Sequence, residues 1–295
     1  MPRQKPKLSK VVIAIGVVCV IFSSPTISLA WGPEAHKIIA LIAWDELKPN
    51  PKRKICNLMF PSRPFDEDDC ERDFVAASTW ADNIKVDRPQ YNQEHFIERL
   101  FPQGGAPTTP NLVTALNKNW DRLQPDSDSD GNDRLESLLF IIHYVGDIHQ
   151  PLHCASRTST QFPNGDSGAN RLRIIVPDFS GKLRDVPLHR YWDTGLDSFS
   201  ESTFTVKGSV KEIKNKYPDE NKENIDKEKS LPDGRPNFEG WSRESFKLAQ
   251  EVAYAGIEDG GRVSVRYRYN GINTVNMQLA TAGYRLGKLL NAIWH

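Results

Sequence analysis

Metal-binding residue types recur inside the apolar helical segments of this sequence. Residues 133–150 (DRLESLLFIIHYVGDIHQ) have the periodicity of a long, mostly buried helix that stops at Pro151. Within this segment His143 and Asp147 are four residues apart, so both side chains lie on one helix face. A carboxylate buried on an apolar face is costly unless a cation accompanies it. The pair therefore predicts a metal site.

A second histidine–aspartate pair has the same spacing. His189 and Asp193 lie in the sequence LHRYWD, which predicts another helix. His153 follows the proline that ends the long helix, so its side chain can return toward the first pair. Three further candidates stand elsewhere in the chain: His36, Asp82 and His95. A single histidine is more often an ordinary polar residue than a ligand, but two such pairs on apolar helix faces favour a metal centre.

The first 30 residues have the three parts of a secretory signal peptide. The start, MPRQKPKLSK, carries four basic residues and no acidic one, and the apolar run VVIAIGVVCVIFS follows. This run has 13 residues, whereas a membrane-spanning helix needs about 20. The alternative, an uncleaved membrane anchor, is therefore disfavoured. Small residues at Ser28 and Ala30 predict cleavage before Trp31, so that residues 31–295 form the mature chain.

The charge balance bears on nucleic-acid binding. The chain has 38 Lys and Arg residues and 38 Asp and Glu residues, and loss of the four basic residues of the signal peptide leaves 34 against 38. A mildly acidic protein is not expected to have the broad basic surface that binds duplexes without sequence preference. Any nucleic-acid contact is expected to be local, with metal ions supplying positive charge.

Three of the four cysteines remain after removal of the signal peptide. In an export route that permits disulfides, Cys56 and Cys70 are expected to form a bridge around a short loop. Cys154 is then an unpaired thiol beside His153. It is either a ligand or, as is more frequent, a small buried residue.

Helical periodicity predicts an all-α fold, a mainly helical single domain. Besides residues 133–150, helices are expected at residues 34–48, 73–85, 111–123, 237–256 and 273–294. Residues 154–188 predict a long loop with a short hairpin formed by RLRIIVP and GKLRDVP, and the charged residues 207–236 predict a solvated surface segment. Residues 126–137 resemble a calcium loop, but the twelfth position is Ser137, so an acidic turn that caps the following helix is expected.

Six motifs together resemble one known family. They are WGPEAH, WADNIK, HYVGDIHQPLH, GDSGAN, LHRYWDTGL and LATAGYRLGKLL. The chain is similar over essentially all of residues 31–295 to the zinc-dependent single-strand-specific nucleases, also called class I nucleases or 3′-nucleotidases. That family shares a helical fold with bacterial zinc phospholipases C. The resemblance implies a secreted or periplasmic endonuclease with three Zn²⁺ ions, which hydrolyses single-stranded DNA and RNA to 5′-nucleotides and also acts on 3′-nucleotides.

Carried over position by position, the resemblance implies three zinc sites. The first ion is held by Asp82, His95, His143 and a bridging Asp147. The second is held by His36, the same Asp147, and the free amine and carbonyl oxygen of a mature amino-terminal Trp31. The third, more exposed ion is held by His153, His189 and Asp193. The first two ions would activate a water molecule that attacks phosphorus, and the third would hold the phosphate.

The resemblance also implies roles for residues around the ions. Catalytic roles fall to Asp82, Lys85 and Asn170, and substrate binding falls to Lys85, Asn170 and Phe96, whose ring would stack on an unpaired base. The family usually has a second glycine where Ala169 stands, which predicts a change in that loop. A structural or supporting role is expected for His149, and none for His295.

Two other functions are compatible with these motifs. A phospholipase C of the same fold is disfavoured because its last ligand pair is His with Glu, whereas Asp193 stands here, and because its gap from the terminal Trp to the first His is longer. A catalytically silent zinc-binding protein is disfavoured because every expected ligand is present. The sequence implies no stable protein partner and no membrane anchor.

Overall fold

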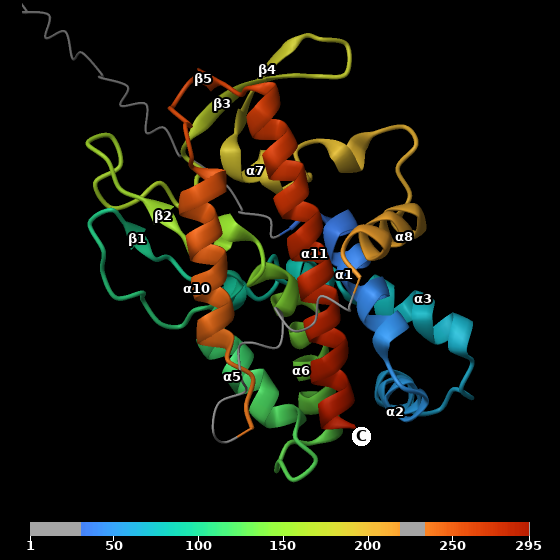
Figure 1. Cartoon of the computed structure of the whole chain (residues 1–295). Coiled ribbons are helices and arrows are strands. Elements are labelled where there is room, and N and C mark those ends of the chain that lie inside the picture. The colour runs from blue at the N-terminus through green and yellow to red at the C-terminus, as the bar shows by residue number, and fades with distance from the viewer. Residues whose placement is uncertain (1–30, 219–233, 295) are drawn as a thin grey trace, which may run out of the picture.

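Helices form most of the protein, as the sequence predicts. The computed structural model describes residues 31–218 and 234–294 (Figure 1). Five helices form the centre: α1 (Pro33–Glu46), α5 (Leu112–Leu123), α6 (Gly131–Asp147), α10 (Phe238–Leu248) and α11 (Val265–Ile293). Shorter helices and turns surround them: α2 (Pro49–Met59), α3 (Glu67–Ala77), α4 (Trp80–Ile84), α7 (Leu188–Asp193), α8 (Val206–Lys216), η1 (Pro89–His95), η2 (Pro151–Cys154), η3 (Ser198–Ser200) and the π-helical turn η5 (Ala249–Ala253).

The core is built around α1, which packs along α11. Nine of the residues of α1 are buried because its sequence is an almost unbroken apolar run rather than a one-sided stripe. Gly283 of α11 permits the close approach, since a β-carbon there would lie 2.6 Å from Cβ of Ile42. Helix α6 is likewise buried over its second half. Both helices that carry candidate ligands at sequence positions 36, 143 and 147 are therefore held rigidly inside the protein.

The predicted hairpin is confirmed. Strand β3 (Arg173–Pro177) pairs antiparallel with β4 (Leu183–Pro187), and β4 leads directly into α7. The structure adds three strands of two residues each: β5 (Gly261–Arg262), parallel to β3, and the parallel pair β1 (Leu100–Phe101) and β2 (Ser156–Arg157). Pairs this short leave no periodic signal in a sequence.

The single helix predicted over residues 73–85 is wrong, because the chain breaks between α3 and α4. The hydroxyl of Ser78 donates to the carbonyl of Val75 at 2.7 Å, and that of Thr79 donates to the carbonyl of Ala76 at 3.2 Å. Such side chains compete with the helical hydrogen bonds. The break leaves the Ser78 carbonyl available to another partner, His143.

The solvated segment predicted over residues 207–236 is wrong in its first part. Helix α8 begins after the cap residue Thr205 and buries Val210 and Ile213, and it packs against α1 and α11. Two apolar residues three positions apart are enough to dock a charged helix when its other face is solvated. Residues 219–233 of that segment lie outside the described residues.

Helix boundaries differ from the predictions in several places. The helix expected over 133–150 spans Gly131–Asp147, and the one expected over 273–294 begins at Val265, where the hydroxyl of Ser264 caps it. Helix α2 is not predicted. The acidic turn is confirmed, since Asp130 accepts from the backbone amides of Asn132 and Asp133 at the start of α6.

The disulfide between Cys56 and Cys70 is present and joins α2 to α3, and Cys154 is a buried free thiol. Among the described residues, no helix is both long and apolar enough to cross a membrane. The predicted signal peptide, residues 1–30, and His295 lie outside the described residues.

Candidate metal centre

Eight predicted ligands from six parts of the chain meet in the interior. They are His36 of α1, Asp82 of α4, His95 at the end of η1, His143 and Asp147 of α6, His153 of η2, and His189 and Asp193 of α7. Their side chains are no more than 12% exposed. Burying so many polar groups together needs a compensating partner.

Asp147 lies at the centre of this cluster. One carboxylate oxygen, Oδ2, is 2.9 Å from Nδ1 of His95 and 3.2 Å from Nε2 of His143. The other oxygen, Oδ1, is 3.4 Å from Nε2 of His36 and 4.0 Å from Nδ1 of His153. Burial opposes the charge, but the facing imidazoles, His143 foremost, hold the pKa of this carboxyl well below its usual value. Asp147 is therefore a charged group that faces both halves of the cluster.

Asp82 and Lys85 form an adjoining pair. Oδ1 of Asp82 lies 3.6 Å from Nε2 of His143 and 2.6 Å from Nζ of Lys85. The lysine side chain is only 4% exposed, so it is not an ordinary surface lysine. Burial raises the pKa of Asp82, but His143 and Lys85 outweigh it, and the net shift is downward.

The remaining candidate ligands form a separate group. Nε2 of His189 is 3.2 Å from Nε2 of His153 and 3.5 Å from Oδ2 of Asp193. The buried amide of Gln150 donates to the other oxygen of Asp193 at 2.8 Å, while its own carbonyl accepts from the backbone amide of Leu152. The bond from the Leu152 amide fixes which end of the Gln150 side chain faces Asp193. Gln150 therefore holds one carboxylate oxygen of Asp193 and leaves the second oxygen facing the two histidines.

Within residues 31–218 and 234–294, three sets of candidate ligand atoms are close enough to hold an ion, each with its atoms within 4.8 Å of one another. The sets are His36–Asp82–His143, His95–His143–Asp147, and His153–His189–Asp193. The first two share His143 and adjoin at Asp147. This grouping differs from the implied one, in which His36 joins Asp147 and Trp31. The division of ligands between ions therefore stays a prediction.

Trp31 lies against this cluster. Its side chain is fully buried, and the amide of the next residue, Gly32, donates to the carbonyl of Asp193 at 3.0 Å. One turn further on, α1 presents His36 to Asp147. The hydrogen bond from Gly32 thus attaches the backbone next to the predicted mature terminus to helix α7, which carries Asp193.

Unsatisfied polar atoms indicate that cations fit here. Among the described residues, both ring nitrogens of His36, Nε2 of His95 and Oδ1 of Asp147 are buried without a hydrogen-bond partner. Each such atom costs about 1–3 kcal/mol when it is left unpaired. Neutral imidazoles and carboxylates are the ligands that Zn²⁺ prefers, so the donor set is suited to it.

Three of the imidazoles are oriented by backbone carbonyls. Nδ1 of His143 lies 2.7 Å from the carbonyl of Ser78, that of His153 lies 2.7 Å from the carbonyl of His95, and that of His189 lies 2.6 Å from the carbonyl of Gly168. A proton on Nδ1 is donated to the carbonyl, which leaves the lone pair of Nε2 for the centre of the cluster. The fold itself therefore selects the tautomer that binds a metal.

For three of the histidines the protonation state also favours ligand chemistry. Burial lowers the pKa of His36 and His153 and lowers that of His95 to about 4, so these rings are neutral near pH 7. Burial opposes a proton on His143, but Asp147 and Asp82 raise its pKa. Burial raises the pKa of Asp193 well above its usual value.

The loop GDSGAN keeps a strained geometry despite Ala169. Ser167 and Ala169 have φ angles of 56° and 65°, in the left-handed region that glycine favours. Asp166 holds the loop by accepting from the amides of Arg157 and Ala169 and from the hydroxyl of Tyr254. Asn170, which is partly exposed, donates to the carbonyl of Ser167 at 2.9 Å. The alanine thus adopts the left-handed conformation, at a cost of about 1–2 kcal/mol, and the loop still presents the Gly168 carbonyl to His189.

His149 lies behind the cluster, away from the ligands. Its Nδ1 is 2.7 Å from the carbonyl of Val145, and its Nε2 is 2.9 Å from Arg285, which also binds Glu244. The predicted supporting role fits this position. Sequence reasoning missed Gln150 and Arg285, because neither stands in a recognisable spacing relative to the residue that it contacts.

Gly146 sets the distance between α6 and α1. A β-carbon at this position would lie 2.8 Å from Nδ1 and 3.0 Å from Cε1 of His36, closer than such atoms pack. We expect Gly146→Ala to displace the His36 ring, to lower stability by about 1–3 kcal/mol, and to reduce bound metal. Urea unfolding and metal analysis of the purified variant measure both effects.

Gly131→Ala is the matched control, because it lies at the exposed start of the same helix with nothing within 4 Å. It is expected to be neutral or stabilising by up to about 1 kcal/mol. Unchanged stability and metal content in Gly146→Ala would contradict the close-approach argument.

The fold and the cluster together define a helical protein that can hold metal ions between buried histidines and carboxylates. The chain belongs to the S1/P1 nuclease family, whose model matches residues 31–295. It is 26% identical to Endonuclease 2 of Arabidopsis thaliana over 96% of this chain and 97% of that protein. It is 25% identical to Nuclease S1 of Aspergillus oryzae over 59% of this chain and 58% of that protein, and 21% identical to Nuclease P1 of Penicillium citrinum over 89% and 97%. The protein is therefore a nuclease, a phosphodiesterase that acts on nucleic acid.

Proposed function

We propose that this nuclease is an exported zinc-dependent endonuclease, which hydrolyses single-stranded DNA and RNA to 5′-nucleotides and removes the 3′-phosphate from nucleotides. The observation that carries the proposal is the buried cluster around Asp147, whose ligand atoms face one another with unpaired lone pairs. Names of the relatives, endonuclease and nuclease, agree with cleavage inside a strand.

Three zinc ions would be held by nine residues: Trp31, His36, Asp82, His95, His143, Asp147, His153, His189 and Asp193. Ions bound there would supply Lewis-acid activation of a water nucleophile and neutralise charge on the phosphate. The protein's part is to fix the ligand geometry through Asp147 and through the backbone carbonyls that orient the rings.

Three further residues would act on the substrate. Lys85 is held beside Asp82 and would donate from Nζ to a phosphate oxygen as negative charge develops. Asn170, at the exposed edge of its loop, would donate to the same phosphate. Phe96, half-buried and next to His95, would stack on a base. Stacking needs a base face freed from its neighbours, which favours single strands.

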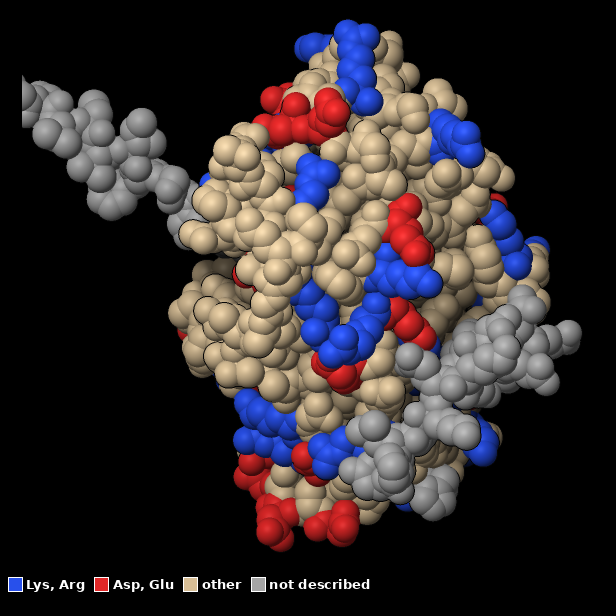
Figure 2. All heavy atoms as spheres, turned by 60° about the vertical axis from the view of Figure 1, so that its left-hand side comes forward, with Lys and Arg blue, Asp and Glu red and all other residues tan. Residues whose placement is uncertain are grey.

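The face of the protein drawn in Figure 2 favours local rather than extended contact with nucleic acid. On the face of Figure 2, blue Lys and Arg side chains are interspersed with red Asp and Glu side chains within a broad neutral surface. Binding of long duplexes without sequence preference depends on continuous positive charge. A substrate would therefore be held mainly by the metal centre and the groups beside it.

Export with cleavage before Trp31 belongs to the same proposal. Residues 1–30 would be a signal peptide, and the family match begins at residue 31. The mature chain would then be secreted or periplasmic, a location that suits the disulfide between Cys56 and Cys70.

One assay tests the substrate class and the cofactor together. Purified protein is offered single-stranded DNA, single-stranded RNA, duplex DNA, 3′-AMP and phosphatidylcholine, before and after chelation and again after addition of Zn²⁺. We expect hydrolysis of the first two and of 3′-AMP, little action on the duplex, none on the lipid, loss on chelation and recovery with zinc. Hydrolysis that persists after complete metal removal, or preference for the lipid, would overturn the proposal.

Acid should remove metal first through two of the proposed ligands. Binding of a metal requires a charged carboxylate and neutral imidazoles. The pKa of His143 and that of Asp193 are both raised, so protons compete for these two ligands at a higher pH than for His95, whose pKa is about 4, or for Asp147, whose pKa is lowered. Metal analysis after dialysis at steps from pH 7 to pH 4 should therefore show a loss of metal that begins well above pH 4. Full metal content at pH 4 would contradict this prediction.

A further inference from the structure

A large pocket lies outside the metal centre. It is bordered by β1, the loop after it, the first turn of α5 and one side of α10, and its volume is about 800 Å³. None of the nine proposed metal ligands lines it. Its wall is nevertheless adjacent to the cluster, since the amide of Ile97 in that wall donates to the carbonyl of His153 at 2.7 Å. A cavity of this size accommodates a small organic ligand.

Two guanidinium groups face this pocket. Arg99 is 9% exposed, and its Nη2 donates to Glu239 and to Ser242, both at 2.8 Å. Its buried Nε has no hydrogen-bond partner among residues 31–218 and 234–294. Arg243 lies one turn after Glu239 on α10 and contacts the same carboxylate at 2.9 Å through Nε. One carboxylate shared by two guanidinium groups leaves the pocket with net positive charge, which attracts an anion.

Aromatic rings line another part of the wall of this pocket. Phe101 and Phe246 are partly buried, with ring centroids 5.8 Å apart in an edge-to-face arrangement. The exposed amide of Gln250 stands on the same wall as Phe246, one turn further along the chain. Rings that line a pocket provide a surface on which a planar base can rest.

We propose that this pocket binds a nucleotide, with its phosphate on Arg99 and Arg243 and its base against Phe101 and Phe246. The combination of guanidinium groups and aromatic rings fits a ligand that joins an anion to a planar ring. The proposal rests on the nuclease function, since hydrolysis of nucleic acid supplies nucleotides of this form. The pocket would thus retain a product, or one nucleotide of a bound strand, away from the ions.

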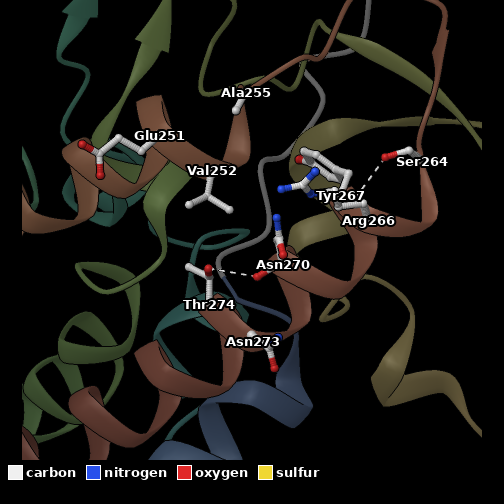
Figure 3. Close-up of a pocket in the computed structure, with 9 residues that line it drawn as sticks. All are labelled: Glu251, Val252, Ala255, Ser264, Arg266, Tyr267, Asn270, Asn273 and Thr274. Atoms are coloured by element: carbon white, nitrogen blue, oxygen red, sulfur yellow. Dashed lines mark hydrogen bonds between the residues drawn. The ribbon is translucent and has the colours of Figure 1, made fainter.

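A second hollow does not have this combination. It lies between η5 and the start of α11, has a volume of about 440 Å³, and is lined by residues that include Glu251, Arg266 and Asn270 (Figure 3). Both charged side chains there are exposed, and the hydroxyl of Tyr267 is occupied by Trp192 and by the carbonyl of Ala253. No buried charged group of this hollow is left without a partner.

Calorimetric titration of the zinc-loaded protein with 5′-AMP tests the pocket. The variant Arg243→Glu reverses an exposed charge at the pocket, and Lys247→Glu makes the same change one turn away on α10, outside the pocket. We expect Arg243→Glu to bind one 5′-AMP fewer per chain than wild type, or to bind it at least about tenfold more weakly at that site. Lys247→Glu should match wild type. Adenosine alone and inorganic phosphate alone should each bind the pocket more weakly than 5′-AMP.

Two results overturn the proposal: equal stoichiometry and affinity in wild type and Arg243→Glu, or binding by inorganic phosphate as tight as that of 5′-AMP. Hydrolysis of single-stranded DNA is measured in parallel. If single-stranded DNA is hydrolysed but no 5′-AMP binding depends on Arg243, the pocket proposal alone is contradicted. If hydrolysis is absent but 5′-AMP binding depends on Arg243, the proposed enzyme function is contradicted and the pocket proposal stands. Equal unfolding temperatures of the two variants exclude a folding defect.

Discussion

Asp147→Asn is expected to remove two ions per chain and to lower hydrolysis of single-stranded DNA by more than about 100-fold. Loss of a group that only supports a ligand typically costs 10–100-fold, and Asp147 is a candidate ligand itself. Its two oxygens face His95 and His143 on one side and His36 on the other. The amide that replaces it has the same shape but no negative charge to hold two cations. Metal analysis and initial rates at saturating zinc measure the two effects.

Asp133→Asn provides the control for that experiment. It makes the same chemical change near the exposed start of α6 and should keep the full metal content and rate. If Asp147→Asn also retained three ions, the carboxylate would not bridge, and the proposed division of ligands would have to be revised.

A single extra residue before Trp31 is expected to abolish one metal site. The resemblance assigns a ligand role to the free amine of Trp31, and only a chain that begins at this residue has that amine. The fully buried indole and the bond from Gly32 to Asp193 leave the terminus little freedom to move aside. We expect a chain that begins Ala-Trp31 to bind one ion fewer than a chain that begins at Trp31, and its rate to fall by more than about 100-fold, beyond the loss typical of supporting groups.

Both chains can be made by removal of a cleavable leader, so that they differ in one residue. Amino-terminal sequencing verifies each start, and unfolding temperature in the presence of chelator compares the folds without the contribution of metal. Equal metal content in the two chains would show that the amine is not a ligand, and cleavage before Trp31 would lose its functional meaning.

The sequence predicts the elements that carry the candidate ligands well because their signals are local. The four-residue spacing of His143 and Asp147, and of His189 and Asp193, places each pair on one helix face, and the structure has both pairs on helices α6 and α7. The bridge between Cys56 and Cys70 and the hairpin also follow from short-range features. The family match supports the resemblance that these motifs carry.

Contacts between distant segments could not be predicted in the same way. The break at Ser78 depends on hydroxyl groups that compete with the helical hydrogen bonds, and the carbonyl of Ser78 then bonds to His143, 65 positions away. The role of Gln150 is visible only in the folded chain, where α7 places Asp193 2.8 Å from its amide. Likewise, the sequence of α8 alone predicts a solvated segment, whereas in the structure α8 packs against α1 and α11 and buries Val210 and Ile213. Tertiary packing decides each of these cases.

The main-chain carbonyls of Ser78, His95 and Gly168 hold three imidazoles in place, and each carbonyl belongs to a different stretch of polypeptide from the ring that it orients. The folded backbone thus sets the orientation of these three rings. We therefore expect these three rings to keep their positions when metal is removed. Stripped and reloaded protein should accordingly regain function at the speed of ion diffusion and dehydration, without a slow refolding step.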